Sequence, residues 1–237
     1  MSTDQRGAPQ QIPLPIRLRA SSIFGNYHAG PNADVVTVLH DLRTVGPHPV
    51  LFLYGAAGLG KTHLLQALCA RAGEQQQAAT YLPVRELQDH GPELLAGAEH
   101  MSLVCLDDVA TVLTRADWNR ALFNLYRELE ERGGKLVLAD EQVPAASEFA
   151  LHDLSSRIRA GMLLRLRPLS ESDQIAALRL HAAQRGLELP EEVAMFMLRR
   201  LPRDMSTLCL FLDELDVASL TAQRRLTVPF VRQFLSS

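Results

Sequence analysis

Short continuous apolar runs recur along the first two thirds of the chain. Runs of this length are typical of strands that are buried on both faces of a parallel sheet. The strand candidates are residues 49–54, 78–83, 102–106, 135–139 and 161–166. Segments with helical spacing separate them, notably residues 117–132. The alternation predicts an α/β domain in which helices cover both faces of a parallel sheet.

The pattern changes after residue 168, because no strand-like run follows and the remaining residues have helical spacing. Two polar residues are candidate N-caps: Ser170 for the first helix of this part, which ends near Gly186, and Asn32 for an early helix. A strand-rich part followed by an all-helical part predicts two subdomains. The expected division is a flexible arm at 1–20, an α/β core at 21–168 and a helical subdomain at 169–237.

Composition narrows the class of protein. Hydrophobic residues make up 47% of the chain, charged residues 22%, and the net charge is −3. A chain with net negative charge lacks the overall positive charge with which nucleic-acid-binding proteins contact phosphates, so little direct DNA binding is expected. No apolar run approaches the length that crosses a bilayer. The cysteines Cys69, Cys105 and Cys209 lie far apart in apolar stretches, which indicates buried thiols in the cytoplasm and no zinc site or disulfide.

One motif predicts phosphate chemistry. The stretch GAAGLGKT, Gly55–Thr62, matches G-x-x-x-x-G-K-[ST] and stands between a predicted strand and a predicted helix. Glycines let backbone N–H groups converge on phosphate, and the helix N-terminus adds partial positive charge. Lys61 would reach the β- and γ-phosphates, and the Thr62 hydroxyl would bind Mg²⁺. The nucleotide-binding candidates here are Gly55, Gly58, Leu59, Gly60, Lys61, Thr62 and His63.

Two carboxylates follow the third apolar run. Asp107 would hold Mg²⁺ through water, and Asp108 would polarise an attacking water. By itself an Asp pair after a strand is more often a solvated turn than a metal site. After a phosphate-binding loop at this distance, the metal site is the favoured interpretation.

The motifs GLGKTHLLQAL, LDDV and SSRI resemble those of the AAA+ ATPases of the bacterial DnaA family. A chain that ends after a helical lid and carries QIPLP near its start is similar to the Hda-type regulators within that family. The resemblance covers nearly the whole chain. It implies an AAA+ P-loop core with a parallel sheet, a small all-helical lid, and a bound adenine nucleotide, ADP or ATP, with Mg²⁺.

The resemblance also implies roles for single residues. Arg157, in SSRI, matches the arginine finger that projects into a neighbour's nucleotide site, although it could simply lie on a solvated basic face. Arg203 matches the lid arginine that touches nucleotide, with a lid carboxylate such as Asp204 or Glu214 as its alternative partner. Asp140 falls at the polar sensor position beside the γ-phosphate. The segment expected to pack near adenine contains Ile23, Phe24, Asn26 and Tyr27.

The arm differs from the initiator, and no DNA-binding helix-turn-helix domain is expected after the lid. QIPLP resembles the pentapeptide by which bacterial proteins dock on the replication sliding clamp. Its prolines would hold the backbone extended, so that Leu14 fills an apolar pocket while the Gln11 amide is hydrogen-bonded. The alternative is a Pro-rich tail whose apolar residues fold back on the core. The candidate docking residues are Gln11, Ile12, Pro13, Leu14 and Pro15.

The resemblance implies a regulator that docks on the sliding clamp and stimulates hydrolysis of the ATP held by DnaA, which restrains replication initiation. Its own hydrolysis is expected to be weak or absent, and a homo-oligomer stays an open alternative. One rival is a helicase-loader-like AAA+ ATPase acting on single-stranded DNA, which requires steady turnover of its own ATP. Another is a P-loop small-molecule kinase, which requires an acceptor pocket with a catalytic base.

Overall fold

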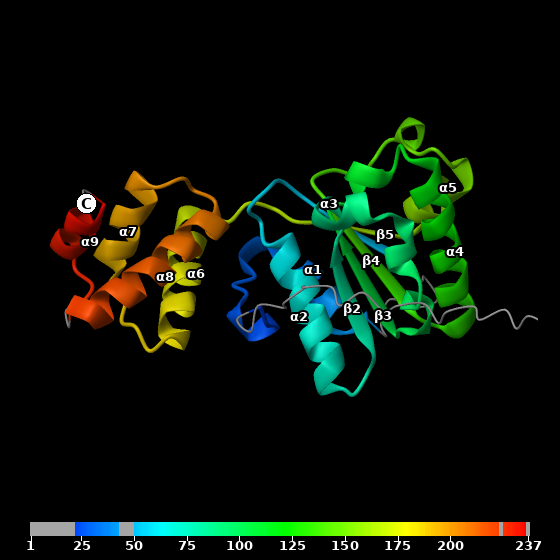
Figure 1. The fold of residues 1–237 in the computed structure, drawn as a ribbon. Coiled ribbons are helices and arrows are strands. Elements are labelled where there is room, and N and C mark those ends of the chain that lie inside the picture. The colour runs from blue at the N-terminus through cyan, green and yellow to red at the C-terminus, as the bar shows by residue number, and fades with distance from the viewer. Residues whose placement is uncertain (1–21, 43–49, 223–224, 236–237) are drawn as a thin grey trace, which may run out of the picture.

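The computed structural model describes residues 22–42, 50–222 and 225–235. An α/β core and a helical lid lie side by side, joined by the chain that follows the last strand (Figure 1). The candidate clamp-docking residues 11–15 lie outside the described residues. None of the described helices is long and apolar enough to cross a membrane.

The predicted strands form one parallel sheet. They are β1 Val50–Tyr54, β2 Ala79–Pro83, β3 Leu103–Asp107, β4 Lys135–Asp140 and β5 Met162–Arg165. Their order is β2-β3-β4-β1-β5, and every neighbouring pair is parallel. Parallel strands place their carboxyl ends at one edge of the sheet, so the loops after β1, β3 and β4 meet there.

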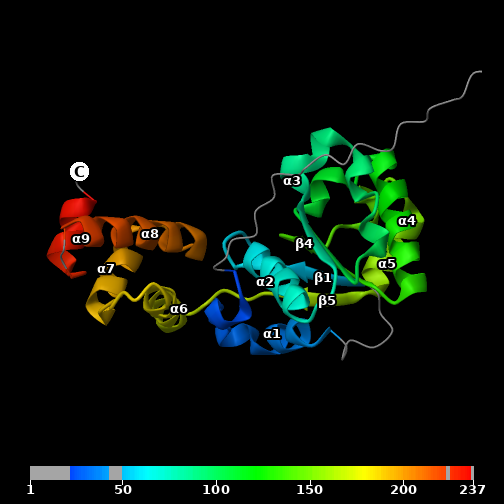
Figure 2. The ribbon, with the colours of Figure 1, turned by 60° about the horizontal axis from the view of Figure 1, so that its bottom comes forward.

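Helices cover both faces of this sheet, as the alternating pattern predicted (Figure 2). Phe52 and Leu53 are neighbours in β1 but belong to different cores, because successive side chains of a strand point to opposite faces. Leu53 packs with α1 and α2, and Phe52 packs with α3, α4 and α5. These helices are α1 Ala33–His40, α2 Lys61–Glu74, α3 Val84–Leu87, α4 Ala116–Arg132 and α5 His152–Ala160.

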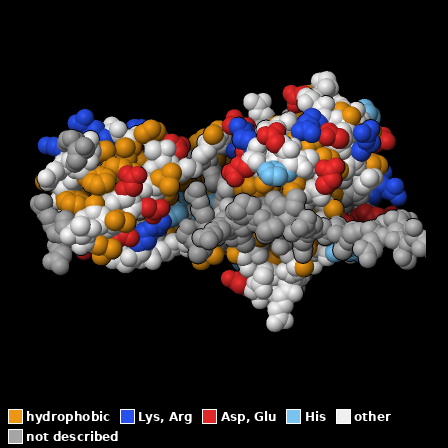
Figure 3. All heavy atoms as spheres, in the orientation of Figure 1, with side chains coloured by type: hydrophobic (Ala, Val, Ile, Leu, Met, Phe, Trp, Pro, Cys, Tyr) orange, Lys and Arg blue, Asp and Glu red, His pale blue; other side chains and the backbone are white. Residues whose placement is uncertain are grey.

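The lid has a core of its own, to which Leu178, Val193 and Leu212 contribute fully buried side chains. Hydrophobic side chains also gather on its surface (Figure 3). Leu210 and Val217 of the longest lid helix are each more than half exposed. The lid helices are α6 Glu171–Gln184, α7 Glu191–Arg200, α8 Met205–Ala222 and α9 Val228–Phe234.

Of the two predicted N-caps, one is confirmed and one is corrected. The Ser170 hydroxyl accepts a hydrogen bond from the Asp173 amide at 3.1 Å, which caps α6. Asn32 stands directly before α1, but its side chain makes no capping bond. The Asn32 amide bonds instead to the backbone of Arg167, donating to the carbonyl at 3.0 Å and accepting from the N–H at 2.7 Å. This long-range pair outcompetes the local cap and joins α1 to the segment that leads to the lid.

Short 3-10 helices complete the connections between the longer elements. They are η1 Phe24–Asn26, η2 Gly30–Asn32, η4 Gln88–His90, η5 Pro92–Leu95, η6 Ala98–His100, η7 Val109–Val112 and η8 Ala146–Glu148.

Candidate functional site

The loop between β1 and α2 is shaped by glycine. Gly58 and Gly60 have φ angles of +76° and +88°, a left-handed conformation that glycine adopts without steric cost. A Cβ atom on Gly60 would lie 2.7 Å from the Tyr27 ring, and one on Gly58 would lie 2.7 Å from Cβ of Asp204. The loop is therefore enclosed between the N-terminal segment and the lid.

Lys61 stands at the first position of α2 and is 8% exposed. Its ammonium group donates to the carbonyl oxygens of Gly55 at 2.6 Å and Ala56 at 3.1 Å. Both partners are neutral, so the positive charge is held inside the loop without being neutralised by them. A buried cation at the N-terminus of a helix, where backbone N–H groups lack helical partners, suits an anionic ligand such as a phosphate.

A hydroxyl and a carboxylate meet beside this loop. The Thr62 hydroxyl donates to Asp107 Oδ2 at 2.6 Å, and the Tyr81 hydroxyl donates to the same oxygen at 3.1 Å. Burial is the main cause that raises the pKa of Asp107, with a smaller contribution from the charge of Asp108, while the bond from Thr62 lowers it. A desolvated carboxylate beside a hydroxyl is a ligand pair that suits a hydrated Mg²⁺ ion.

Tyr81 did not emerge from the sequence. It lies in β2, opposite Cys105 of β3, and its hydroxyl reaches the Asp107 carboxylate at the end of β3. Burial and the neighbouring Asp107 carboxylate both raise the pKa of Tyr81, so the phenol stays a hydrogen-bond donor. An aromatic residue in a neighbouring strand is only a weak sequence signal for such a contact.

The two other predicted carboxylates, those of Asp108 and Asp140, also accept hydrogen bonds. Asp108 has a left-handed backbone with φ +55°, and its side chain accepts a hydrogen bond from Arg85 Nε at 2.9 Å. Asp140 ends β4, directly beside the phosphate-binding loop, and it is 7% exposed. Its carboxylate accepts from the backbone amides of Ala110 at 2.6 Å and Glu141 at 2.7 Å. Backbone contacts therefore fix Asp140 at the edge where the loops meet.

The N-terminal segment lies against the first turn of α2. The Ile23 carbonyl is 2.9 Å from Nε2 of His63, and the Tyr27 hydroxyl donates to the Leu59 carbonyl at 3.1 Å. Phe24 packs with the α2 side of the core, and Asn26 is buried. The structure thus brings the predicted adenine-binding segment and the phosphate-binding loop together.

The lid completes this enclosure through α6. The Gln184 side chain donates to the Gly25 carbonyl at 3.3 Å, and the ring of His181 lies 6.2 Å from that of His63. Burial lowers the pKa of His181 to about 4, so this ring is neutral at pH 7. His181 had no sequence signal, because its role depends on how α6 packs against the core.

The two arginines implied by the resemblance lie in different places. Arg203 is exposed in the lid, and its ion pair of 3.4 Å is with Glu171. Its partner is therefore a lid carboxylate, as the alternative expected, although it is neither Asp204 nor Glu214. Arg157 is exposed on α5, which packs on the sheet face opposite α2 and lies on the side of the core away from the lid (Figure 1). The structure therefore does not bring Arg157 to the loop of its own chain.

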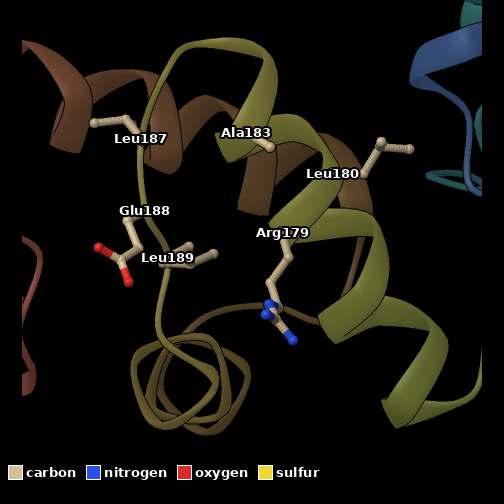
Figure 4. A pocket seen from close by; sticks show the side chains of 6 residues that line it. All are labelled: Arg179, Leu180, Ala183, Leu187, Glu188 and Leu189. Atoms are coloured by element: carbon tan, nitrogen blue, oxygen red, sulfur yellow. The ribbon is translucent and has the colours of Figure 1, made fainter.

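An open depression in the lid lies apart from this site. Figure 4 shows its lining, in which Arg179 and Ala183 come from α6 and Leu189 from the segment that follows. No residue of the phosphate-binding loop lines it, and its side chains form no acid–base pair with a nucleophile. The loop at Gly55–Thr62 is therefore the candidate site.

Comparisons with known proteins agree with this geometry. A family model described as the bacterial DnaA ATPase domain matches residues 24–165, and a model for the lid domain of Hda matches residues 171–235. Domain III of the replication initiation protein DnaA from Thermotoga maritima has a similar structure, with a TM-score of 0.79 and 24% identity. That similarity covers 93% of this chain and 98% of the other.

Two further solved structures share the fold. AMPPCP-bound DnaA from Aquifex aeolicus gives a TM-score of 0.68 at 21% identity, covering 83% of this chain and 65% of that one. The ORC2 protein of Aeropyrum pernix gives 0.61 at 18% identity, covering 86% and 67%. The architecture is that of an AAA+ P-loop domain with a helical lid. The chain belongs to the family of the bacterial DnaA ATPase domain and is an Hda-like, DnaA-related AAA+ protein.

Proposed function

We propose that this chain binds an adenine nucleotide, ADP or ATP, between its core and lid and acts on a DnaA-type initiator. The observation that carries the nucleotide site is the preformed loop, with the Lys61 ammonium buried in it and Thr62 bonded to Asp107 at 2.6 Å. A related DnaA from Aquifex aeolicus was solved with AMPPCP, which supports the same class of ligand here.

The residues fit a magnesium ion as well. Thr62 and Asp107 would hold it, and the ion would neutralise part of the phosphate charge when bound. Among the described residues, no cationic side chain is hydrogen-bonded to the buried Asp107 carboxylate, and burial is the main cause of its raised pKa. A divalent cation would offset that desolvation.

Nucleobase and lid contacts follow from the enclosure around the loop. Ile23 and Tyr27 would border the base, with His63 of α2 alongside. Arg203 would have to leave Glu171 to reach a phosphate, and an exposed ion pair of this kind is worth only about 0–1 kcal/mol. Breaking this ion pair so that Arg203 can contact the nucleotide therefore costs little free energy.

The action on the initiator is assigned to Arg157. Its position away from the chain's own loop suits a residue that enters a neighbour's site, and an arginine supplied in trans accelerates phosphoryl transfer by ~10³–10⁵. Intrinsic hydrolysis is expected to be weak or absent, so that the chain acts on the initiator's ATP and not on its own. In this scheme hydrolysis of the initiator's ATP restrains replication initiation.

Docking on the sliding clamp completes the proposal, and it rests on the sequence of residues 11–15. A short segment with two prolines loses little conformational entropy on binding as an extended peptide. Such docking would place Arg157 near initiator molecules gathered at loaded clamps.

The test is hydrolysis of ATP bound to the DnaA initiator, measured with DNA-loaded clamp and this protein. Arg157→Ala is expected to lower the stimulated rate by ~10³–10⁵, because it removes the charge that stabilises the transition state. Arg159→Ala is the matched control, since Arg159 is exposed on the same helix and donates to the Pro144 carbonyl at 3.1 Å. If Arg157→Ala stimulates as well as the control, Arg157 is not the finger.

A further inference from the structure

Arg157 packs against an aromatic ring of the neighbouring helix. The carbon at the centre of its guanidinium group lies 5.8 Å from the centroid of the Tyr126 ring in α4. At this separation the face of a ring attracts a cation, and the interaction does not consume the N–H donors in the guanidinium plane. We propose that Tyr126, held by Glu130, is a positioning residue that presents Arg157 to the phosphates of a nucleotide bound by a partner protein.

The Tyr126 ring is itself fixed. It is 4% exposed within the core between the sheet, α4 and α5, and its hydroxyl donates to the Glu130 carboxylate at 2.6 Å. Burial raises the pKa of Tyr126 and the bond to Glu130 raises it further, whereas the positive charge of Arg157 and a hydrogen-bonding contact with it lower the pKa. The phenol therefore remains a donor at neutral pH, and its bond to a carboxylate enriches the ring in electrons.

The backbone under Arg157 is equally constrained. Leu154 and Ile158 are fully buried in the same core, so α5 is anchored on both sides of Arg157. Gly161 ends the helix, and a Cβ atom there would lie 2.7 Å from the Val50 carbonyl oxygen, so α5 meets β1 at close range. A fixed backbone leaves the rotamers of the long side chain as the main freedom to be restrained.

The partners of the Arg157 guanidinium group explain why an aromatic ring, and not a carboxylate, positions it. In the part of the chain that the structure describes, no carboxylate lies within ion-pair distance of Arg157, whereas Arg203 is paired with Glu171. A carboxylate partner would compete with the incoming phosphate for the same N–H groups. Tyr126 carries no negative charge, so it restrains the arginine without an anion that would compete with the phosphate.

The experiment compares Tyr126→Leu, Tyr126→Phe and Arg157→Ala in the stimulated hydrolysis of initiator-bound ATP, with full-length protein and DNA-loaded clamp. Tyr126→Leu should lower the maximal stimulated rate by roughly threefold to thirtyfold, from the range of cation–π energies, with little change in the concentration for half-maximal effect. Tyr126→Phe keeps the ring face and should remain within about threefold of the unaltered protein.

The inference rests on the proposed function of Arg157, and the outcomes separate the two. If Arg157→Ala stimulates normally, the proposed role of Arg157 fails and the inference falls with it. If Arg157→Ala is inactive while Tyr126→Leu matches the unaltered protein, only the positioning role is refuted. A Tyr126→Leu protein that raises the half-maximal concentration at an unchanged maximal rate also refutes it.

A second measurement is independent of any fold defect in Tyr126→Leu. In the unaltered protein labelled with ¹⁵N-arginine, ring current should shift the Arg157 side-chain protons upfield. Arg157→Lys identifies the signal. Random-coil shifts for these protons would mean that the guanidinium does not rest on the ring, and the proposal would be withdrawn.

Discussion

Replacing Asn119 tests how the structure holds the helix that carries Arg157. Asn119 is fully buried in α4. Its amide nitrogen donates to the carbonyls of Leu113 at 2.7 Å and Arg115 at 2.8 Å, and its oxygen accepts from the Leu151 amide at 3.1 Å. Since Leu151 directly precedes α5, one side chain joins the start of α4 to the start of α5.

The magnitude follows from these three bonds. Asn119→Ala leaves the buried Leu151 amide without this partner, at a cost of about 2 kcal/mol. The Leu113 and Arg115 carbonyls keep a backbone partner and lose one bond each, at about 1 kcal/mol apiece, or about 4 kcal/mol for all three losses together. Alanine is the better helix former and returns about 0.7 kcal/mol. The net loss in the free energy of unfolding is about 3 kcal/mol, which lowers the melting temperature by about 6–12 °C for a chain of this size.

Asn124→Ala is the matched control, since Asn124 lies in the same helix but is exposed. It receives the same gain in helix propensity and loses no buried bond, so its stability should stay within about 0.5 kcal/mol of the unaltered protein. Urea unfolding and melting curves followed by circular dichroism measure both variants. Equal stabilities for Asn119→Ala and Asn124→Ala would refute the reasoning, because burial is the main difference between the two sites.

Three further predictions concern the site and the arm. The raised pKa of Asp107 means that the folded state holds this proton more tightly than the unfolded chain, so without Mg²⁺ and nucleotide stability should fall as pH rises from about 4 through the raised pKa. Asp107→Asn should remove that part of the slope in urea midpoints, and an unchanged slope would contradict the shift. Lys61→Ala should abolish binding of ADP and ATP in isothermal titration. The control Lys135→Ala, at the opposite end of the sheet, should bind both nucleotides normally. Equal affinities for the two variants would mean that Lys61 does not bind phosphate. A peptide of residues 10–18 should bind the sliding clamp with a micromolar constant, about −8 kcal/mol, and Leu14→Ala should weaken it roughly thirtyfold; loss of thermal stability in the whole protein instead would favour a tail folded on the core.

Local patterns determined the elements of this protein. Continuous apolar runs predicted all five strands, because strands covered on both faces have no polar side to alternate with. The cap at Ser170 was also predictable, since its partner Asp173 lies within the same first turn. The phosphate-binding loop was identifiable for a similar reason, because its glycines and Lys61 act within one short segment.

Only the tertiary structure decided which side chains meet. Thr62 and Asp107 belong to different elements, and the order of the strands puts them 2.6 Å apart. Asn32 illustrates the reverse, since a residue suited to a local cap bonds instead to Arg167, far along the chain. The stacking of Arg157 on Tyr126 likewise depends on how α5 packs beside α4. Such contacts depend on strand order, register and helix packing, which bring together residues whose separation along the chain carries no signal of their contact.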